Sequence, residues 1–345
     1  MMRLKRMIPG GSAQLFGWIR LLSRFSFLEA LSKGLMFGIG IVVIRSLGKT
    51  EYAYYTITHS MLGALGLLSM LGINTAIVSL GGRVIGDRHA MGRLLKTGYH
   101  YRLLVSGAVA PPIALFSVYL LLKNGCPPVY AALLLALAAA VFVIQIHEQL
   151  ATTVLRLAEQ YLYLQKLQLG ANLLRLFVVL AFAAFYLQAW VLLSITVVIQ
   201  FAVFVGWIRW RTREYVDPRA ARSDAFAGRL KRISWNALPG TLSAVFQAQL
   251  AVALISVFGE ADSVAELGAL TRIGILFAIP QAFNRGIFMP WLARSPGGLP
   301  LARKFGAVTL LGFGIAAAFV AAVVLLRGPI LGLLGEGYLH LEREL

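Results

Sequence analysis

Nine ionisable side chains lie within long apolar segments of this chain, where little water is present to stabilise a charge. They are Glu29, Lys33, Arg45, His59, His147, Glu148, Arg175, Arg272 and Arg285. Lysine and arginine outnumber glutamate five to two in this set. A cationic side chain in such surroundings binds phosphate or carboxylate through strong charge-assisted hydrogen bonds. The set therefore favours an anionic ligand over a cationic one.

Lys33 and Arg272 are the first candidates for contact with an anionic ligand. Lys33 lies roughly 10 Å inside its apolar segment, which makes the membrane surface hard for its ammonium group to reach. Glu29 stands four residues earlier on the same helix face, so the two side chains form an ion pair, line a ligand cavity, or do both. Arg285 follows Arg272 at about 140° around a straight helix. The two arginines therefore share a cavity only if Pro280 bends that helix.

The other intramembrane charges have simpler explanations. Arg45 and Arg175 are predicted to lie near helix ends, from which a long side chain reaches the lipid headgroups. Polar residues also cluster at the expected cytoplasmic end of a helix, where they meet headgroups: Gln145, His147, Glu148 and Gln149. Because His147 and Glu148 are adjacent, they point about 100° apart and are poorly placed to share a metal ion. We predict no metal site and no cofactor.

The composition indicates a membrane protein. Hydrophobic residues make up 59% of the 345 residues and charged residues 13%, with a mean hydropathy of +0.78. The net charge of +18 suggests nucleic-acid binding in a soluble protein. Here the basic residues flank apolar segments, where they orient helices and meet anionic lipids, so we expect no nucleic acid. The sequence has no nucleophile–base set, no phosphate-binding glycine loop and no CxxC pair, which argues against a membrane enzyme.

A bilayer core requires about 20 apolar residues per helix, and this criterion divides the chain into nine predicted spans. They cover residues 26–46, 54–80, 101–122, 129–153, 169–187, 189–208, 235–258, 267–291 and 304–326. Of the 32 lysines and arginines, five lie well inside spans and only four on the side opposite the N-terminus, namely Lys49, Lys123, Arg327 and Arg343. Arg102 and Lys304, at the first residues of their spans, are assigned to the N-terminal side. The remaining 23 lie on the N-terminal side. The asymmetry predicts a cytoplasmic N-terminus.

The spans are predicted to form two lobes. The basic segment 209–234 reads as a cytoplasmic linker between a first lobe of six helices, 25–208, and a second lobe of three, 235–345, after a cytoplasmic N-terminal segment, 1–24. Leu47-Gly48 corresponds to Phe258-Gly259 at an offset of about 211 residues, as expected of a transporter built from repeats. The second lobe then lacks three helices, so we expect either a fragment or a short second lobe.

The segment from Leu47 to Ala76 resembles polysaccharide-biosynthesis flippases of the multidrug/oligosaccharidyl-lipid/polysaccharide exporter superfamily. The matching positions are Leu47, Gly48, Glu51, Tyr52, Tyr55, Leu71, Gly72 and Ala76, whereas Ala53 replaces a usual glycine. A looser match in the second lobe comprises Phe258, Gly259, Val264, Arg272, Ile273, Pro290 and Arg294, with Ala265 and Leu267 in place of the usual Gly and Tyr. The resemblance runs through most of residues 25–339, and it rests on order and spacing rather than on one motif.

This resemblance implies an all-α, two-lobed, polytopic transporter that moves a polyprenyl-diphosphate-linked oligosaccharide to the outer leaflet by alternating access. It also implies that the membrane is a bacterial inner membrane. The expected partners are this anionic glycan lipid, anionic membrane lipids, and a polysaccharide polymerase or glycosyltransferase. Lys33, Arg272, Arg285 and Glu29 are then the candidate cavity residues. Gln247 and Gln249 either line a sugar path or hydrogen-bond to neighbouring helices. The alternatives are a cation/drug antiporter of the same fold and a membrane enzyme, a polymerase or ligase, of the same pathway.

Overall fold

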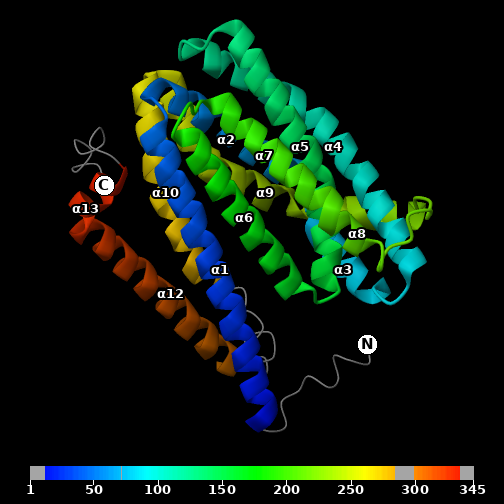
Figure 1. Cartoon of the computed structure of the whole chain (residues 1–345). Helices are drawn as coiled ribbons and strands as arrows, with labels where there is room; N and C mark the ends of the chain where they lie inside the picture. Colours follow the sequence, from blue (N-terminus) through cyan, green and yellow to red (C-terminus); the bar gives the residue numbers. More distant parts are fainter. Residues whose placement is uncertain (1–11, 71, 284–298, 335–345) are drawn as a thin grey trace. The chain divides into compact units, whose positions relative to one another are not determined.

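A computed structural model describes residues 12–70, 72–283 and 299–334 of the chain, and its regular structure there is entirely helical (Figure 1). The helices are α1 (Ser12–Ser46), α2 (Lys49–Met70), α3 (Ile73–Val84), α4 (Arg88–Lys123), α5 (Pro128–Leu157), α6 (Tyr161–Ala183), α7 (Ala189–Val203), the π-helical turn η2 (Phe204–Ile208), α8 (Arg209–Thr212), α9 (Asp224–Phe258), α10 (Ala261–Phe283), α12 (Leu299–Leu325) and α13 (Arg327–Leu334). The all-α prediction is confirmed.

Seven of the described helical segments are long and apolar enough to cross a membrane. They belong to α1, α4, α5, α6, α7 with its continuation to Thr212, α9 and α12. The pair α2 and α3 is bent by 45° and counts as an eighth span if taken as one. α10 covers the first part of the remaining predicted span, 267–291, whose residues from 284 onward lie outside the described part. Each predicted span therefore coincides, wholly or in part, with a helix or the bent pair.

The chain forms two compact units. The smaller comprises Met1–Gly38 with Arg272–Leu345, and in it α13 packs against α12. The larger, Ile39–Thr271, holds α2 to α9 and the adjoining ends of α1 and α10. In the larger unit α9 packs against α2, α3 and α4. The lobes expected from the sequence, 25–208 and 235–345, remain a prediction.

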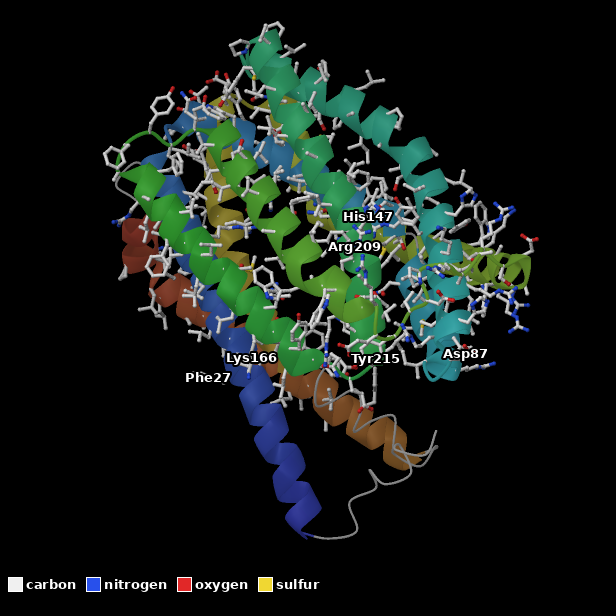
Figure 2. All side chains as sticks on the ribbon, turned by 45° about the vertical axis from the view of Figure 1, so that its right-hand side comes forward. Phe27, Asp87, His147, Lys166, Arg209 and Tyr215 are labelled. Carbon is white, nitrogen blue, oxygen red and sulfur yellow. The ribbon has the colours of Figure 1, made fainter. Side chains whose placement is uncertain are left out.

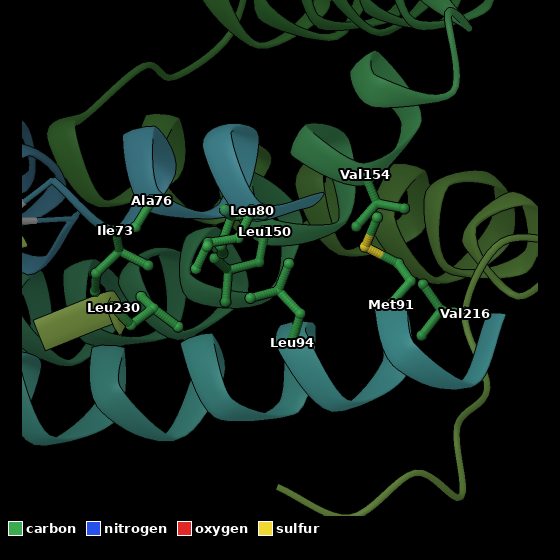
Figure 3. Packing of buried hydrophobic residues seen from close by; sticks show 10 residues of the cluster. Ile73, Ala76, Leu80, Met91, Leu94, Leu150, Val154, Val216 and Leu230 are labelled. Atoms are coloured by element: carbon green, nitrogen blue, oxygen red, sulfur yellow. The ribbon is translucent and has the colours of Figure 1, made fainter. Parts of the chain in front are cut away.

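A hydrophobic core joins four helices of the larger unit (Figure 3). Its buried members are Ile73, Ala76, Ile77 and Leu80 of α3, Met91 and Leu94 of α4, Leu150 and Val154 of α5, Leu230 of α9, and Val216 between α8 and α9. Gly72 starts α3 in a left-handed conformation, with φ 73°, against the backbone of Ser234 in α9. A side chain at Gly72 would be both strained and crowded, because its Cβ would stand 2.5 Å from the Cβ of Ala237.

The segment 213–223, which we call the docked segment, connects α8 to α9 and lies against α4. Arg88 donates a hydrogen bond to the carbonyl oxygen of Arg213 at 2.7 Å, and the backbone N–H of Ser223 donates to Thr97 Oγ1 at 3.0 Å. The ring of His89 lies 2.9 Å from a carboxylate oxygen of Asp217 and, with the backbone N–H of Arg219, holds the pKa of Asp217 below its ordinary value. This contact therefore persists at neutral pH and weakens only as pH falls through the lowered pKa. Of the 26 residues of the predicted linker, 209–212 form α8, the 11 residues 213–223 are the docked segment, and 224–234 are the start of α9.

A substitution at Gly92 should release the docked segment. An added Cβ at Gly92 would stand 2.5 Å from the backbone oxygen of Asp217 and 2.7 Å from the Cβ of Ala220. Gly92→Ala is therefore expected to speed tryptic cleavage within 213–223 severalfold, measured by gel electrophoresis on inverted membrane vesicles. Gly228→Ala, a helical position with nothing within 4 Å, should leave the cleavage rate unchanged. Equal cleavage of both variants and the parent protein would show that Gly92 does not hold the segment.

The charge asymmetry makes a separate prediction about orientation. Lys123, Glu260 and Arg222 are exposed in the structure, so a cysteine at each position should be reactive wherever reagent is present. In intact cells, cysteines at Lys123 and Glu260 should react with a membrane-impermeant thiol reagent, and one at Arg222 only after permeabilisation. Labelling of the Arg222 site in intact cells would reverse the predicted orientation.

Candidate binding site in the membrane-spanning region

The structure describes two of the four predicted cavity residues. Lys33 Nζ lies 3.9 Å from Glu29 Oε1 on the next turn of α1, and both side chains are half-buried. The intrahelical ion pair that the sequence allows is thus formed. Arg272 belongs to α10, but its side chain lies outside the described part, as does the whole of Arg285. Their predicted role in a cavity with Lys33 remains a prediction.

The polar cluster at residues 145–149 is not at a helix end, contrary to the prediction. α5 continues to Leu157, so the cluster lies within the helix. Its side chains contact different neighbours. Gln149 accepts a hydrogen bond from Arg102 at 2.8 Å, and the ring of His147, labelled in Figure 2, lies 4.7 Å from that of Tyr99. The predicted span, 129–153, ended four residues before α5 does. His147, Glu148 and Gln149 contact side chains of other helices, whereas the side chain of Gln145 has no hydrogen-bond partner among the described residues.

Arg102 is a buried arginine that the sequence analysis assigned to the cytoplasmic surface. The assignment is wrong because α4 begins at Arg88, about four turns earlier, which carries Arg102 into the interior. Its side chain is fully buried and donates to Ser69 Oγ at 3.1 Å, to Gln149 Oε1 at 2.8 Å, and to the backbone oxygens of Ile146 at 3.0 Å and Gln145 at 3.4 Å. All of these acceptors are neutral. Arg102 therefore ties α4 to α2 and α5 and leaves a positive charge in the helix bundle.

Arg175 also lies deeper than predicted. α6 runs from Tyr161 to Ala183, so Arg175 is about four turns from the predicted cytoplasmic end, too far for a simple extension to those headgroups, and about two turns from the other end. The guanidinium lies close enough to Glu148 of α5 and Tyr55 of α2 to interact with both electrostatically. Its Nε is buried without a hydrogen-bond partner among the described residues. An unsatisfied buried donor of this kind is uncommon and marks a candidate functional position.

One face of α2 supplies further residues of this candidate site. Tyr55, His59, Gly63 and Gly66 share this face because they are spaced by four, four and three residues. The rings of Tyr55 and His59 are stacked at 5.6 Å. At the two glycines, amide side chains take the space that a Cβ would fill. Gln249 Nε2 of α9 lies 2.7 Å from the Cβ position of Gly63, and Gln145 Oε1 of α5 lies 3.8 Å from that of Gly66.

We call these eight residues the polar face. They are Tyr55, His59, Gly63 and Gly66 of α2, Gln145 and Glu148 of α5, Arg175 of α6, and Gln249 of α9. The group offers hydrogen-bond donors and acceptors together with an aromatic surface. Within the described residues, no three His, Cys, Asp or Glu side chains are placed to hold a metal ion. Polar-ligand binding is the chemistry that this arrangement suits.

Ion pairs fix α10 to α2 at the predicted outer end. Lys49 Nζ lies 3.3 Å from Glu266 Oε1 and 3.7 Å from Asp262 Oδ2. Below these pairs Gly268 lies so close to α2 that a Cβ would stand 2.4 Å from Thr56 Oγ1. Asn124 Nδ2 also donates to the backbone oxygen of Ser256 at 3.1 Å, which holds the end of α9 against the connection between α4 and α5. These contacts hold the α9–α10 pair beside the α2 side of the polar face.

No family model matches the sequence, and no curated protein matches it. Among solved structures, the chain resembles one described as "Crystal structure of MATE in complex with MaD3S", where MATE denotes a multidrug and toxic compound extrusion transporter. The two share 14% sequence identity with a TM-score of 0.62, and the match covers 94% of this chain and 77% of that chain. At this identity the likeness concerns the fold. The chain therefore has the transporter fold of a MATE protein, as the resemblance to the exporter superfamily predicts.

Proposed function

We propose that this protein is a membrane transporter that moves a polyprenyl-diphosphate-linked oligosaccharide from the cytoplasmic to the outer leaflet by alternating access. The fold supports transport, and the sequence resemblance supports the cargo. The observation that carries the proposal is the charge balance of the described membrane helices. Glu29 lies beside Lys33 and Glu148 beside Arg175, whereas buried Arg102 contacts only neutral acceptors. The surplus is positive, and it favours an anionic cargo.

The same charge balance disfavours a cation or drug antiporter, and the sequence disfavours an enzyme. A cation or drug antiporter needs carboxylates to receive a cation, and both Glu29 and Glu148 already lie beside a basic side chain. A polymerase or ligase needs a reacting group, and the sequence has no nucleophile–base set to supply one. We also propose that the basic cytoplasmic residues contact anionic lipids, and that a polymerase or glycosyltransferase receives or supplies the cargo.

Deletion of the gene in its host separates these functions in one experiment. Loss of a flippase should abolish surface polysaccharide and leave the lipid-linked oligosaccharide in the inner leaflet, detected by radiolabelling and protection from an added glycosidase. Loss of a polymerase would shorten the surface glycan instead. Loss of a drug antiporter would raise drug sensitivity without changing the glycan, and either of these results would overturn the proposal.

A further inference from the structure

We propose that the polar face binds the glycan of the lipid-linked cargo, with Gln145 and Gln249 as its hydrogen-bonding residues. The inference rests on the proposed function and goes beyond it. It assigns sugar recognition to the larger unit, through residues other than the cations expected to hold the diphosphate.

Gln145 and Gln249 both lie deep within their helices, and in the described part of the chain their side chains are unpaired. Each lies at least about 13 Å from either end of its helix, too deep for an amide to reach the headgroups. Within the described residues neither side-chain amide has a hydrogen-bond partner, and both side chains are half-buried. An amide left unpaired at this depth is unfavourable in hydrocarbon, where no water is present to take the place of a partner. A polar ligand that reaches the partly open polar face removes that cost.

The chemistry of an amide selects the class of ligand. Each glutamine presents two N–H donors and a carbonyl acceptor, and a sugar hydroxyl both donates and accepts, so the two groups pair reciprocally. A phosphate only accepts and would leave the amide oxygens unpaired. Arg175 is matched by Glu148, so this part of the polar face carries little net charge to hold a diphosphate.

The remaining residues give the site its shape. Gly63 and Gly66 have no side chains, so the amides of Gln249 and Gln145 lie directly against α2. The stacked rings of His59 and Tyr55 lie one and two turns before Gly63 on the same face, and His59 is exposed. Aromatic rings present a flat apolar surface beside polar groups, which suits the C–H face of a sugar ring. Amides and rings together thus form a surface for a pyranose.

The inference can be tested with two lipid probes whose only difference is the presence of a sugar. The purified full chain in detergent is titrated with undecaprenyl diphosphate and with undecaprenyl-diphosphate-linked N-acetylglucosamine, and tryptophan fluorescence reports binding. The wild-type protein should bind the sugar-bearing probe at least about fivefold more tightly, the size expected of one or two neutral hydrogen bonds. Gln249→Leu and Gln145→Leu should each reduce this preference about fivefold and leave the affinity for undecaprenyl diphosphate unchanged.

Gln247→Leu is the matched control. Gln247 lies on the same helix, is exposed, and bonds to Ser243 Oγ at 3.3 Å, outside the polar face, so both affinities should match the wild type. Equal binding of the two probes by the wild type would overturn the glycan site and leave the flippase proposal standing. If Gln249→Leu lowers the affinity for both probes, the glycan site is likewise overturned, because Gln249 would then be needed for the structure of the protein and not for sugar binding alone. Failure of the wild type to bind either probe would instead count against the proposed function.

Discussion

Lys33→Glu and Arg272→Glu should each abolish movement of the lipid-linked glycan while the protein remains at normal abundance in the membrane. A charge-assisted contact to a diphosphate is worth roughly 1.5–3 kcal/mol, and a glutamate replaces that attraction with repulsion in a weakly screened site. Lys33→Glu also sets two carboxylates four residues apart, because Glu29 occupies the preceding turn. Surface glycan per unit of inserted protein measures the effect.

Two variants control this prediction. Lys33→Arg keeps the charge and should be tolerated, whereas Arg45→Glu should be nearly silent because Arg45 is exposed in the last turn of α1. Normal transport by both glutamate variants at positions 33 and 272 would show that these cations merely reach the headgroups. The diphosphate role of Lys33 and Arg272 would then be abandoned.

Arg102→Met should lower the free energy of unfolding by roughly 2–4 kcal/mol. The variant loses the bonds to Ser69, Gln149 and the α5 backbone, and it leaves the buried Ser69 hydroxyl oxygen and the half-buried Gln149 amide oxygen without this donor. Arg102→Lys keeps the charge but cannot reproduce the planar fork of donors, so it should be only partly stable. Unfolding temperature in detergent, with the transition followed by size-exclusion chromatography, measures both effects.

The triple variant Arg102→Met/Ser69→Ala/Gln149→Leu separates lost bonds from orphaned acceptors. Removing the acceptors together with the donor leaves no buried oxygen unpaired, so the triple variant should recover much of the stability lost in Arg102→Met. If Arg102→Met is as stable as the parent protein, the hydrogen bonds of Arg102 contribute nothing net, and its role as a link between α2, α4 and α5 is wrong.

The helices were predictable from hydropathy because a bilayer imposes length and composition on each span. Their ends were not, and this explains where the site prediction failed. α4 and α6 begin well before their apolar runs, so Arg102 and Arg175 were placed near a surface that they do not reach. The partners that make this depth tolerable, such as Ser69 for Arg102 and Glu148 for Arg175, come from other helices. No local pattern in the sequence identifies such partners.

The polar face is another case in which the helices were predictable from the sequence but the contacts between them were not. Glycines in a membrane helix, such as Gly63 and Gly66, permit close contact with another helix. The sequence did not show that the atoms meeting these glycines are amides, because Gln145 and Gln249 are far away along the chain. In the same way, a basic composition predicted a linker over 209–234, whereas the turns near Asp217 and Ser223 find hydrogen-bond partners on α4.

The length of α4 also bears on how the protein is made. α4 has 36 residues, about 54 Å of helix against a hydrocarbon layer of about 30 Å. The α5 groups that bond Arg102 follow it by 43 to 47 residues, so Arg102 is synthesised before these partners exist. A helix of this length exceeds the hydrocarbon layer by enough to span it with Arg102 still among the headgroups until α5 is made. The order of synthesis, as well as the final contacts, thus determines when this charge becomes buried.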